Sequence, residues 1–325
     1  MDSISSILSL RVPDLVPFRF DPLFAGTFLI LLVSLATPVL AESPETSDPE
    51  ALMTAGLWTE AETAAQTMVA QEPSNALGWY FLGRALFERG RPADLGDAVS
   101  HLSRAVSLEP GFAPAWYWQG RASGQLAGSG GLMERIRLAG KTREAFAGAL
   151  ELDPENFEYA YALVQFYLRA PVMVGGGREK AEEVSLRFTG QKPGEKLLLE
   201  ASVSLAGNDD ERVVSLLSEV GDMDDRSIRS TWKEIALQLG RRQLSEQLWN
   251  AAAGTYGLII ERLPDLPVGY LGIGRALEGN GRIDEAREAY GRCVTLAPGS
   301  PAAEDAKNRL NATEGTRSKG VKRQR

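Results

Sequence analysis

The chain has 325 residues, with 35 basic and 43 acidic side chains and a formal net charge of −8. Because the two signs are interspersed, no basic face for nucleic acid is expected, and we predict no nucleic-acid partner. One cysteine, Cys293, excludes an internal disulfide and a zinc site with several cysteines, and one histidine, His101, excludes histidine-rich metal sites. We therefore expect no metal and no cofactor.

An uncharged run near the N-terminus, PLFAGTFLILLVSLATPVLA at residues 22–41, is too apolar for an exposed surface. Val39 and Ala41 place small residues where a signal peptidase reads them, and Pro38 breaks the helix just before. This pattern predicts a signal peptide over residues 1–41, cleaved after Ala41. The alternative is an uncleaved membrane anchor, since a bilayer core requires about 20 apolar residues.

Either alternative places the rest of the chain outside the cytoplasm. The sequence therefore predicts an exported protein, periplasmic or envelope-associated, and an uncleaved segment would add membrane association. Residues 42–48, rich in Glu, Ser, Pro and Thr, form a linker to the part that folds.

From residue 49 onward, prolines recur at the ends of expected helix pairs, at Pro73, Pro110, Pro154, Pro193, Pro264 and Pro298. The pattern of residues 49–75 predicts a truncated first pair of helices. Residues 76–112 give a near-complete second pair, in which Gly83 lies where two helices cross closely and Trp79 fills the space beside it. Truncating Trp79, or the corresponding Trp116, is expected to cost about 3–5 kcal/mol as for a buried aromatic.

The next two units, residues 113–156 and 157–195, break the spacing. An insertion follows the first helix of the third unit, and Leu132–Leu152 predicts an unusually long second helix. In the fourth unit, Pro171 stops the first helix, and the glycines at 175–177 open a turn before the second.

The last units vary in quality. The pattern is degenerate over residues 196–228, with two short helices expected around the turn at 207–210, and it recovers over 229–266. It is clearest at 267–300, where the apolar and small positions are Tyr270, Ile273, Gly274, Leu277, Ala286, Tyr290 and Cys293. Cys293 stands at a small buried position of this pattern, so we interpret it as core. A cap is predicted at 301–310, and residues 311–325 as a disordered basic tail.

The 34-residue stretch 267–300 resembles the tetratricopeptide repeat, whose period is about 34 residues. The resemblance implies an all-α, right-handed superhelical solenoid of helix–turn–helix repeats over residues 49–310, and a general role in assembling protein complexes. The segments GLMERIRLAGKTREAFAGALELDPEN and YLRAPVMVGGGREKA are similar to a group of exported bacterial tetratricopeptide proteins. That second resemblance implies no particular activity.

In such an array the first helices line the concave side, which is the usual binding surface. Positions one and five residues after the tryptophan position then give a candidate groove made of Tyr80, Arg84, Tyr117, Arg121, Tyr161, Gln165 and Arg275, and Phe87 extends the same side. Arginine binds carboxylates through two hydrogen bonds, and tyrosine supplies rigid amphipathic area, so this set suits an extended peptide or a carboxylate ligand. The competing interpretation is an ordinary solvated helix face.

Other features carry weaker predictions. The glycines at 175–177, followed by Arg178 and Lys180, could hold an anion, but no Walker context surrounds them and a structural turn is favoured. His101 has no partner for metal binding and is expected to be surface or partly buried. No nucleophile motif or general acid–base spacing is present, so we predict no enzymatic activity.

The sequence thus predicts a non-enzymatic adaptor of the periplasm or cell envelope that binds a protein or peptide in its groove. The alternative is an auxiliary subunit of an envelope transporter that binds a small carboxylated solute.

Overall fold

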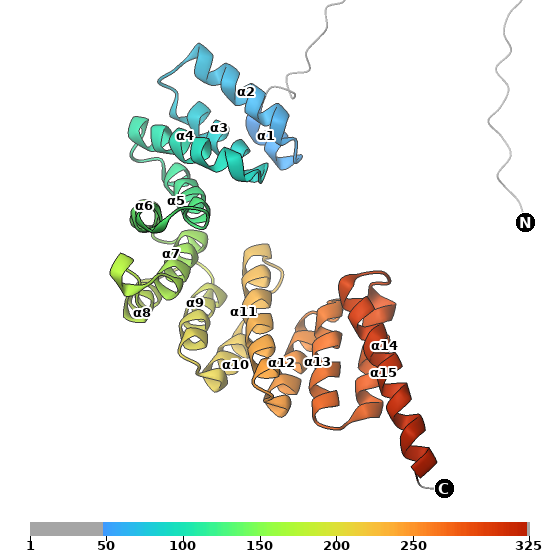
Figure 1. Ribbon diagram of the computed structural model, residues 1–325. Helices are drawn as coiled ribbons and strands as arrows, with labels where there is room; N and C mark the ends of the chain where they lie inside the picture. The colour runs from blue at the N-terminus through green and yellow to red at the C-terminus, as the bar shows by residue number, and fades with distance from the viewer. Residues whose placement is uncertain (1–47, 324–325) are drawn as a thin grey trace, which may run out of the picture. The chain divides into compact units, whose positions relative to one another are not determined.

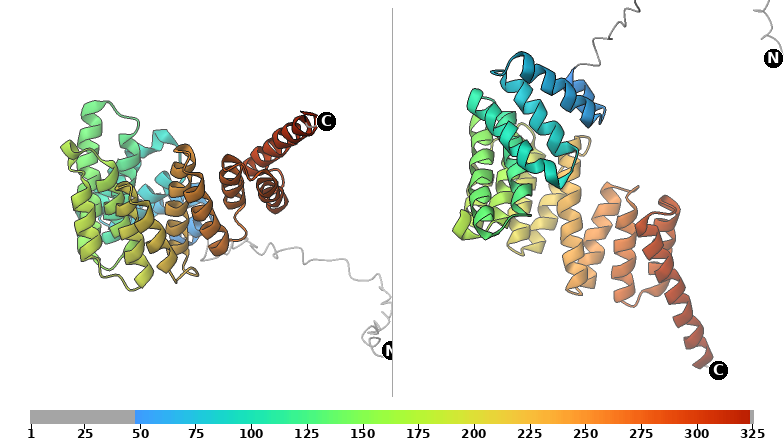
Figure 2. Two further views of the ribbon diagram at one scale, coloured as in Figure 1. Left: turned by 90° about the horizontal axis from the view of Figure 1, so that it is seen from below. Right: turned by 45° about the horizontal axis from the view of Figure 1, so that its top comes forward.

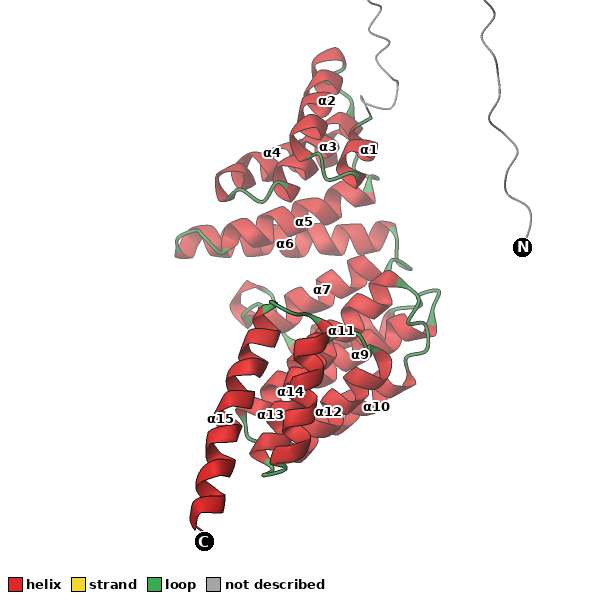
Figure 3. Cartoon of the chain, turned by 90° about the vertical axis from the view of Figure 1, so that its right-hand side faces the viewer, coloured by secondary structure: helices red, strands yellow, loops and turns green. Residues whose placement is uncertain are grey.

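A computed structural model describes residues 48–323, with side chains to residue 313. The predicted signal peptide or anchor lies outside the described residues. Within them the chain forms α-helices, two short 3-10 helices and connecting loops, and no strand (Figures 1 and 3). The helix bounds are α1 Pro49–Thr54, α2 Trp58–Gln71, α3 Ala76–Glu88, η2 Pro92–Asp94, α4 Leu95–Leu108, α5 Ala113–Ala127, α6 Leu132–Leu152, α7 Phe157–Arg169, η3 Val172–Val174, α8 Arg178–Arg187, α9 Pro193–Ala206, α10 Asp210–Glu219, α11 Arg226–Ser245, α12 Trp249–Arg262, α13 Pro267–Gly279, α14 Ile283–Leu296 and α15 Pro301–Arg323.

Each helix packs mainly against the one before and the one after it, which is the organisation of a helical solenoid. The prediction of an all-α repeat fold is confirmed. The long helix expected over Leu132–Leu152 is present as α6, and α7 ends at Arg169, just before the proline that was expected to stop it.

Glycines lie where the paired helices come closest. A Cβ atom at Gly120 would be 2.5 Å from the ring of Phe146, and one at Gly274 would be 2.5 Å from the ring of Tyr290. A larger side chain at either position would have to push the facing helix away. These glycines therefore let large aromatic side chains lie flat against the neighbouring backbone.

The two tryptophans expected in the core are only partly buried. Trp79 and Trp116 donate their indole Nε1–H to the carbonyl oxygens of Pro73 and Pro110, at 2.9 and 2.8 Å. Each ring therefore ties its helix to the preceding proline joint instead of filling the interior. The tryptophan that is fully buried is Trp232 of α11, which donates to the carbonyl of Leu217.

The last helix is longer than the sequence indicated. The cap was expected to end at residue 310, with a disordered tail from 311, but α15 continues to Arg323 and extends past α13 and α14 (Figure 2). Thr313 is buried, and Arg287 donates to its hydroxyl and to the carbonyl of Leu310, at 2.9 Å each. This packing and the absence of proline from residues 311–323 explain why the helix continues.

Across residues 48–323, no helix combines the length and the apolar character that crossing a bilayer would require.

Candidate functional site

Arginine and aromatic side chains from α3 and α5 lie together on one surface. We call these six residues the arginine–aromatic cluster: Tyr80, Arg84 and Phe87 from α3, and Tyr117, Trp118 and Arg121 from α5. On α3 the members are spaced four and three residues apart, and on α5 Arg121 follows Tyr117 by four residues and Trp118 by three, so the members of each helix lie on one side of it. Five of the six belong to the groove predicted from the sequence.

Both arginines stack on Trp118. The guanidinium carbon of Arg84 lies 4.7 Å from the centre of the Trp118 ring, and that of Arg121 lies 4.2 Å from it. Arg121 also lies 5.0 Å from the ring of Phe87. Such cation–π contacts attract the guanidinium to the ring face and leave its edge, where the N–H donors point, free for other partners.

Neither Arg84 nor Arg121 forms an ion pair with a carboxylate within the described part of the chain. Arg84 donates one hydrogen bond, from Nη1 to the Tyr80 hydroxyl at 3.1 Å, while its Nε is buried without a partner. By contrast, Arg89, the residue that follows the last residue of α3, pairs with Glu62 and Asp94. The cluster thus holds two positive charges with unused donors.

The aromatic members differ in exposure. Tyr80 and Phe87 are buried, and they form the wall behind the arginines instead of pointing freely into a groove. Phe87 meets Trp118 edge to face, with ring centres 5.5 Å apart. Tyr117 is partly exposed, and burial is the main reason that the pKa of its hydroxyl is raised, so the hydroxyl is neutral.

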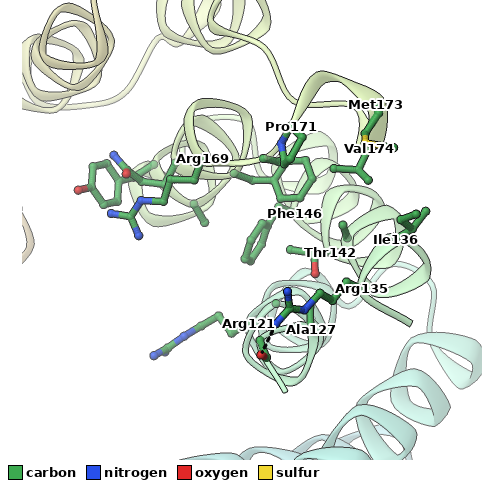
Figure 4. A pocket seen from close by; sticks show the side chains of 18 of the residues that line it. Arg121, Ala127, Arg135, Ile136, Thr142, Phe146, Arg169, Pro171, Met173 and Val174 are labelled. Carbon is green, nitrogen blue, oxygen red and sulfur yellow. Dashed lines mark hydrogen bonds between the residues drawn. The ribbon is translucent and has the colours of Figure 1, made fainter. Parts of the chain in front are cut away.

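A pocket of about 930 Å³ adjoins the cluster, between α5, α6, α7 and η3 (Figure 4). Four of the predicted groove residues line it, namely Tyr117, Arg121, Tyr161 and Gln165. Phe146 and Thr142 of α6 lie at its centre in Figure 4, with Arg135 on one side and Arg169 on the other.

The one acidic residue that lines this pocket, Glu234 of α11, is already engaged. It accepts a hydrogen bond from the Tyr161 hydroxyl at 3.3 Å and forms an ion pair with Arg169 at 3.4 Å. Burial, followed by the charge of Glu234, raises the pKa of Tyr161. The hydroxyl therefore stays protonated and donates to Glu234.

Arg275 is separate from these residues. It is exposed on α13 and lines a smaller pocket of about 300 Å³ together with Arg241 and Asp305. The structure therefore gathers seven of the eight predicted groove residues into the cluster and its adjoining pocket, and leaves Arg275 apart.

Sequence reasoning missed Trp118, Phe146, Arg169 and Glu234. Trp118 could have been found, because it lies three residues before Arg121 and so shares its helical face. Glu234 comes from α11, more than sixty residues from Tyr161 in the sequence, and no local signal would have placed it there.

The glycine turn at 175–177 has a structural explanation. Gly175 and Gly177 have φ values of 94° and 141°, which side chains disfavour, and a Cβ at Gly176 would collide with the carbonyl of Ala170. Lys180 donates to the carbonyl of Gly175 at 3.0 Å, so it closes the turn.

The remaining sequence candidates pack within the fold. His101 is partly buried and stacks on Trp79, with ring centres 5.3 Å apart, and burial lowers its pKa. Cys293 is fully buried.

Consecutive helix pairs with small residues at the helix crossings define an α-helical repeat protein. The tetratricopeptide-repeat family model matches residues 50–94 and 269–300, one near each end of the array. The chain therefore contains segments that match tetratricopeptide repeats near both ends of its helical array. A comparison with curated protein sequences gave no match.

Solved structures with a similar arrangement are all distant in sequence. A chain of the APC/C hetero-tetramer Cut9–Hcn1 is 13% identical with a TM-score of 0.49, and the match covers 82% of this chain and 48% of that one. A tetratricopeptide-repeat protein from Parabacteroides merdae is also 13% identical, with a TM-score of 0.48, covering 82% of this chain and 96% of that one. YrrB, described as a TPR protein with an unusual peptide-binding site, is 16% identical with a TM-score of 0.36, covering 75% and 98%.

Proposed function

We propose that this chain is a non-enzymatic, exported interaction module that binds a protein partner through a peptide segment. The peptide lies across the arginine–aromatic cluster and the adjoining pocket. The observation that carries the proposal is the state of Arg84 and Arg121, which stack on Trp118 with no carboxylate partner among the described residues. Partly buried guanidiniums with unused donors favour a carboxylate-bearing ligand, because charge-assisted hydrogen bonds are the strongest available to them.

A protein partner fits this surface better than a small anion alone. Tyr117 adds rigid aromatic area beside the charges, and the buried Trp118 supports both guanidiniums. Aromatic and arginine side chains together dominate the energetics of protein interfaces. The export part of the proposal rests on the apolar run at residues 22–41 and on Ala41 as the cleavage position. The partner is accordingly a protein of the cell envelope.

Affinity capture from native membranes and periplasm tests the proposal, with the chain expressed at full length. Replacing both Arg84 and Arg121 by alanine should weaken partner retention by at least about tenfold, which corresponds to about 1.4 kcal/mol. Retention by the unaltered chain should also fall as salt rises, because salt screens the charges. The matched control is Arg275→Ala, an exposed arginine at the same repeat position outside the cluster, which should retain the partner normally.

If the double variant retains the partner as well as the unaltered chain does, the cluster is not the binding surface. If Arg275→Ala loses it equally, overall charge and not the cluster is responsible. N-terminal sequencing of the exported chain tests the cleavage: a mature protein that begins at Glu42 supports a signal peptide, and an intact N-terminus supports the membrane anchor.

The size of the pocket favours one second candidate, an auxiliary subunit that binds a free carboxylated solute for an envelope transporter. Small-molecule sites usually enclose about 300–1,000 Å³, and the pocket falls in this range. A solute binder would be stabilised against heat by the free ligand without any partner protein.

A further inference from the structure

Two departures from the repeat pattern meet at the same pocket. One is the turn after α5, which delays the start of α6 to Leu132, and the other is η3, Val172–Val174, inserted between α7 and α8. The two segments are far apart in the sequence, yet α6 and η3 are in contact, and Leu132 and Met173 both line the pocket (Figure 4). The two insertions therefore extend a pocket whose remaining wall is formed by the repeat helices α5, α6 and α7.

The insertions also concentrate exposed apolar side chains. Leu132 is 72% exposed and Met173 is 79% exposed, and their neighbours Met133 and Val172 are 78% and 79% exposed. These four are among only nine large apolar residues that are exposed in the described part of the chain. Large apolar side chains gathered around a pocket indicate a surface that is covered by a ligand or partner.

The interior of the pocket offers few unsatisfied polar groups. The hydroxyl of Thr142 donates to the carbonyl of Leu138 at 2.9 Å, and the Tyr161 hydroxyl is bonded to Glu234. Phe146 supplies an apolar ring at the centre. A group that enters this space gains most by burying apolar surface, at about 25 cal/mol per Å².

Positive charge surrounds this apolar interior. The lining contains Arg121, Arg135 and Arg169 but only one carboxylate, that of Glu234, which Arg169 already pairs. Arg135 donates to the carbonyl of Gly128 at 3.2 Å, and neither it nor Arg121 forms an ion pair within the described residues. The complementary ligand is apolar in its centre and negatively charged on its flanks.

We infer that the pocket between α6 and η3 receives a large apolar side chain of an acidic peptide segment, whose flanking carboxylates contact Arg121 and Arg135. The inference rests on the proposed function and specifies the partner's sequence chemistry. A peptide is favoured over a free amphiphile because the charged aromatic surface continues from Arg121 past Trp118 to Arg84 on α3. An extended chain, which advances about 3.3 Å per residue, can follow this surface beyond the pocket.

The test probes the full-length protein with an immobilised library of randomised decapeptides, with dodecanoate as a separate ligand. Enriched peptides should combine a large apolar residue with aspartate or glutamate within a few positions. Neighbouring residues of equal exposure provide matched variants. Leu132→Asp and Met173→Asp place a negative charge at the pocket, whereas Met133→Asp and Val172→Asp place it beside the pocket.

We expect the two lining variants to bind the enriched peptides at least tenfold more weakly, because each loses an apolar side chain of the pocket and adds a negative charge there. The two neighbouring variants keep the apolar lining and add only the charge, so their loss should be clearly smaller. All four side chains are highly exposed, so none of the changes should unfold the protein. The unaltered chain should not be stabilised by dodecanoate below its micellar concentration.

Three results would overturn the inference. Enriched peptides without acidic or apolar preference would exclude this ligand chemistry. Equal losses in all four variants would indicate a general apolar surface, and saturable binding of dodecanoate that only the lining variants lose would assign the pocket to a free amphiphile. In each case, partner capture that still depends on Arg84 and Arg121 leaves the proposed function intact.

Discussion

Arginines in two regions of this molecule show opposite environments. In the arginine–aromatic cluster, Arg84 and Arg121 stack on Trp118, and neither forms an ion pair with a carboxylate in the described part of the chain. Near the C-terminus, Arg309 of α15 pairs with Glu278 at 3.0 Å and with Asp305 at 3.3 Å, and the hydroxyl of Tyr290 donates to Glu278 at 2.5 Å. We call these four residues the terminal network.

The terminal network satisfies its charges internally, whereas the two arginines of the cluster have no ion-pair partner among the described residues. Tyr290 is fully buried, and burial together with the neighbouring Glu278 raises its pKa, so its hydroxyl remains a hydrogen-bond donor. Tyr117, the tyrosine of the cluster, is partly exposed. The comparison teaches that nearby carboxylates, and not the arginine itself, decide whether the charge of an arginine is paired within the fold or is left for the binding surface that we propose.

The largest expected effect comes from Tyr290→Ala. Removing this fully buried ring should lower the free energy of unfolding by about 3–5 kcal/mol, because it leaves a cavity and removes the hydrogen bond that the hydroxyl donates to Glu278. Tyr117→Ala, as the counterpart in the cluster, should cost less than half as much. Urea denaturation of both variants measures the difference, and equal losses would show that the two regions are packed alike.

Gly274→Ala should destabilise the same region by about 1–3 kcal/mol, because the added Cβ would lie 2.5 Å from the Tyr290 ring. The matched control is Gly291→Ala on α14, where no atom lies within 4 Å of the added Cβ. That control should stabilise the protein by about 0.5–1 kcal/mol, through better helix propensity. Thermal unfolding separates the two signs, and a stabilising Gly274→Ala would contradict the close approach.

Arg309→Met removes both ion pairs and keeps the length of the side chain. We expect a loss of about 1–2 kcal/mol in the free energy of unfolding, since hydrogen bonds to charged groups contribute roughly this amount. Arg121→Met should cost less, about 0.5–1 kcal/mol, because it loses cation–π contacts but no ion pair. Urea denaturation of both variants measures the difference. A larger loss for Arg121→Met than for Arg309→Met would contradict the comparison.

The smallest effect concerns pH. Burial lowers the pKa of His101 below its usual 6.5, so the folded chain binds this proton less readily than the unfolded chain. The contribution of His101 to the free energy of unfolding is therefore fully present above about pH 6.5. It declines as pH falls from there toward the pKa of His101 in the folded state. His101→Phe keeps an aromatic ring against Trp79 and should flatten this part of the profile of Tm against pH. An unchanged profile between pH 5 and 7 would exclude His101 as its source.

Much of the fold follows from local signals in the sequence. Leu132–Leu152 could be predicted as one long helix because it contains no proline, and Pro171 ends α7 because its ring prevents the helix from continuing. The extension of α15 beyond residue 310 was not predictable in the same way. It depends on contacts such as the hydrogen bond from Arg287 to Thr313, which join two helices.

The candidate site was only partly predictable. The spacing of Tyr and Arg placed most of the cluster on the first helices, but the run Trp116-Tyr117-Trp118 contains three aromatic residues whose roles depend on neighbouring helices. Trp116 bonds the carbonyl of Pro110, whereas Trp118 lies under both arginines. Periodicity describes which face a residue occupies, and it cannot tell which partner covers that face.

Because Cys293 is buried, cysteines introduced near the pocket can be labelled selectively. The side chain of Cys293 is fully buried, and burial raises its pKa, so little reactive thiolate is present at neutral pH. A cysteine introduced at exposed positions such as Met133 or Val172 would therefore react with a maleimide dye while the native thiol stays silent. Fluorescent reporters can then be placed beside either insertion without first removing a native cysteine.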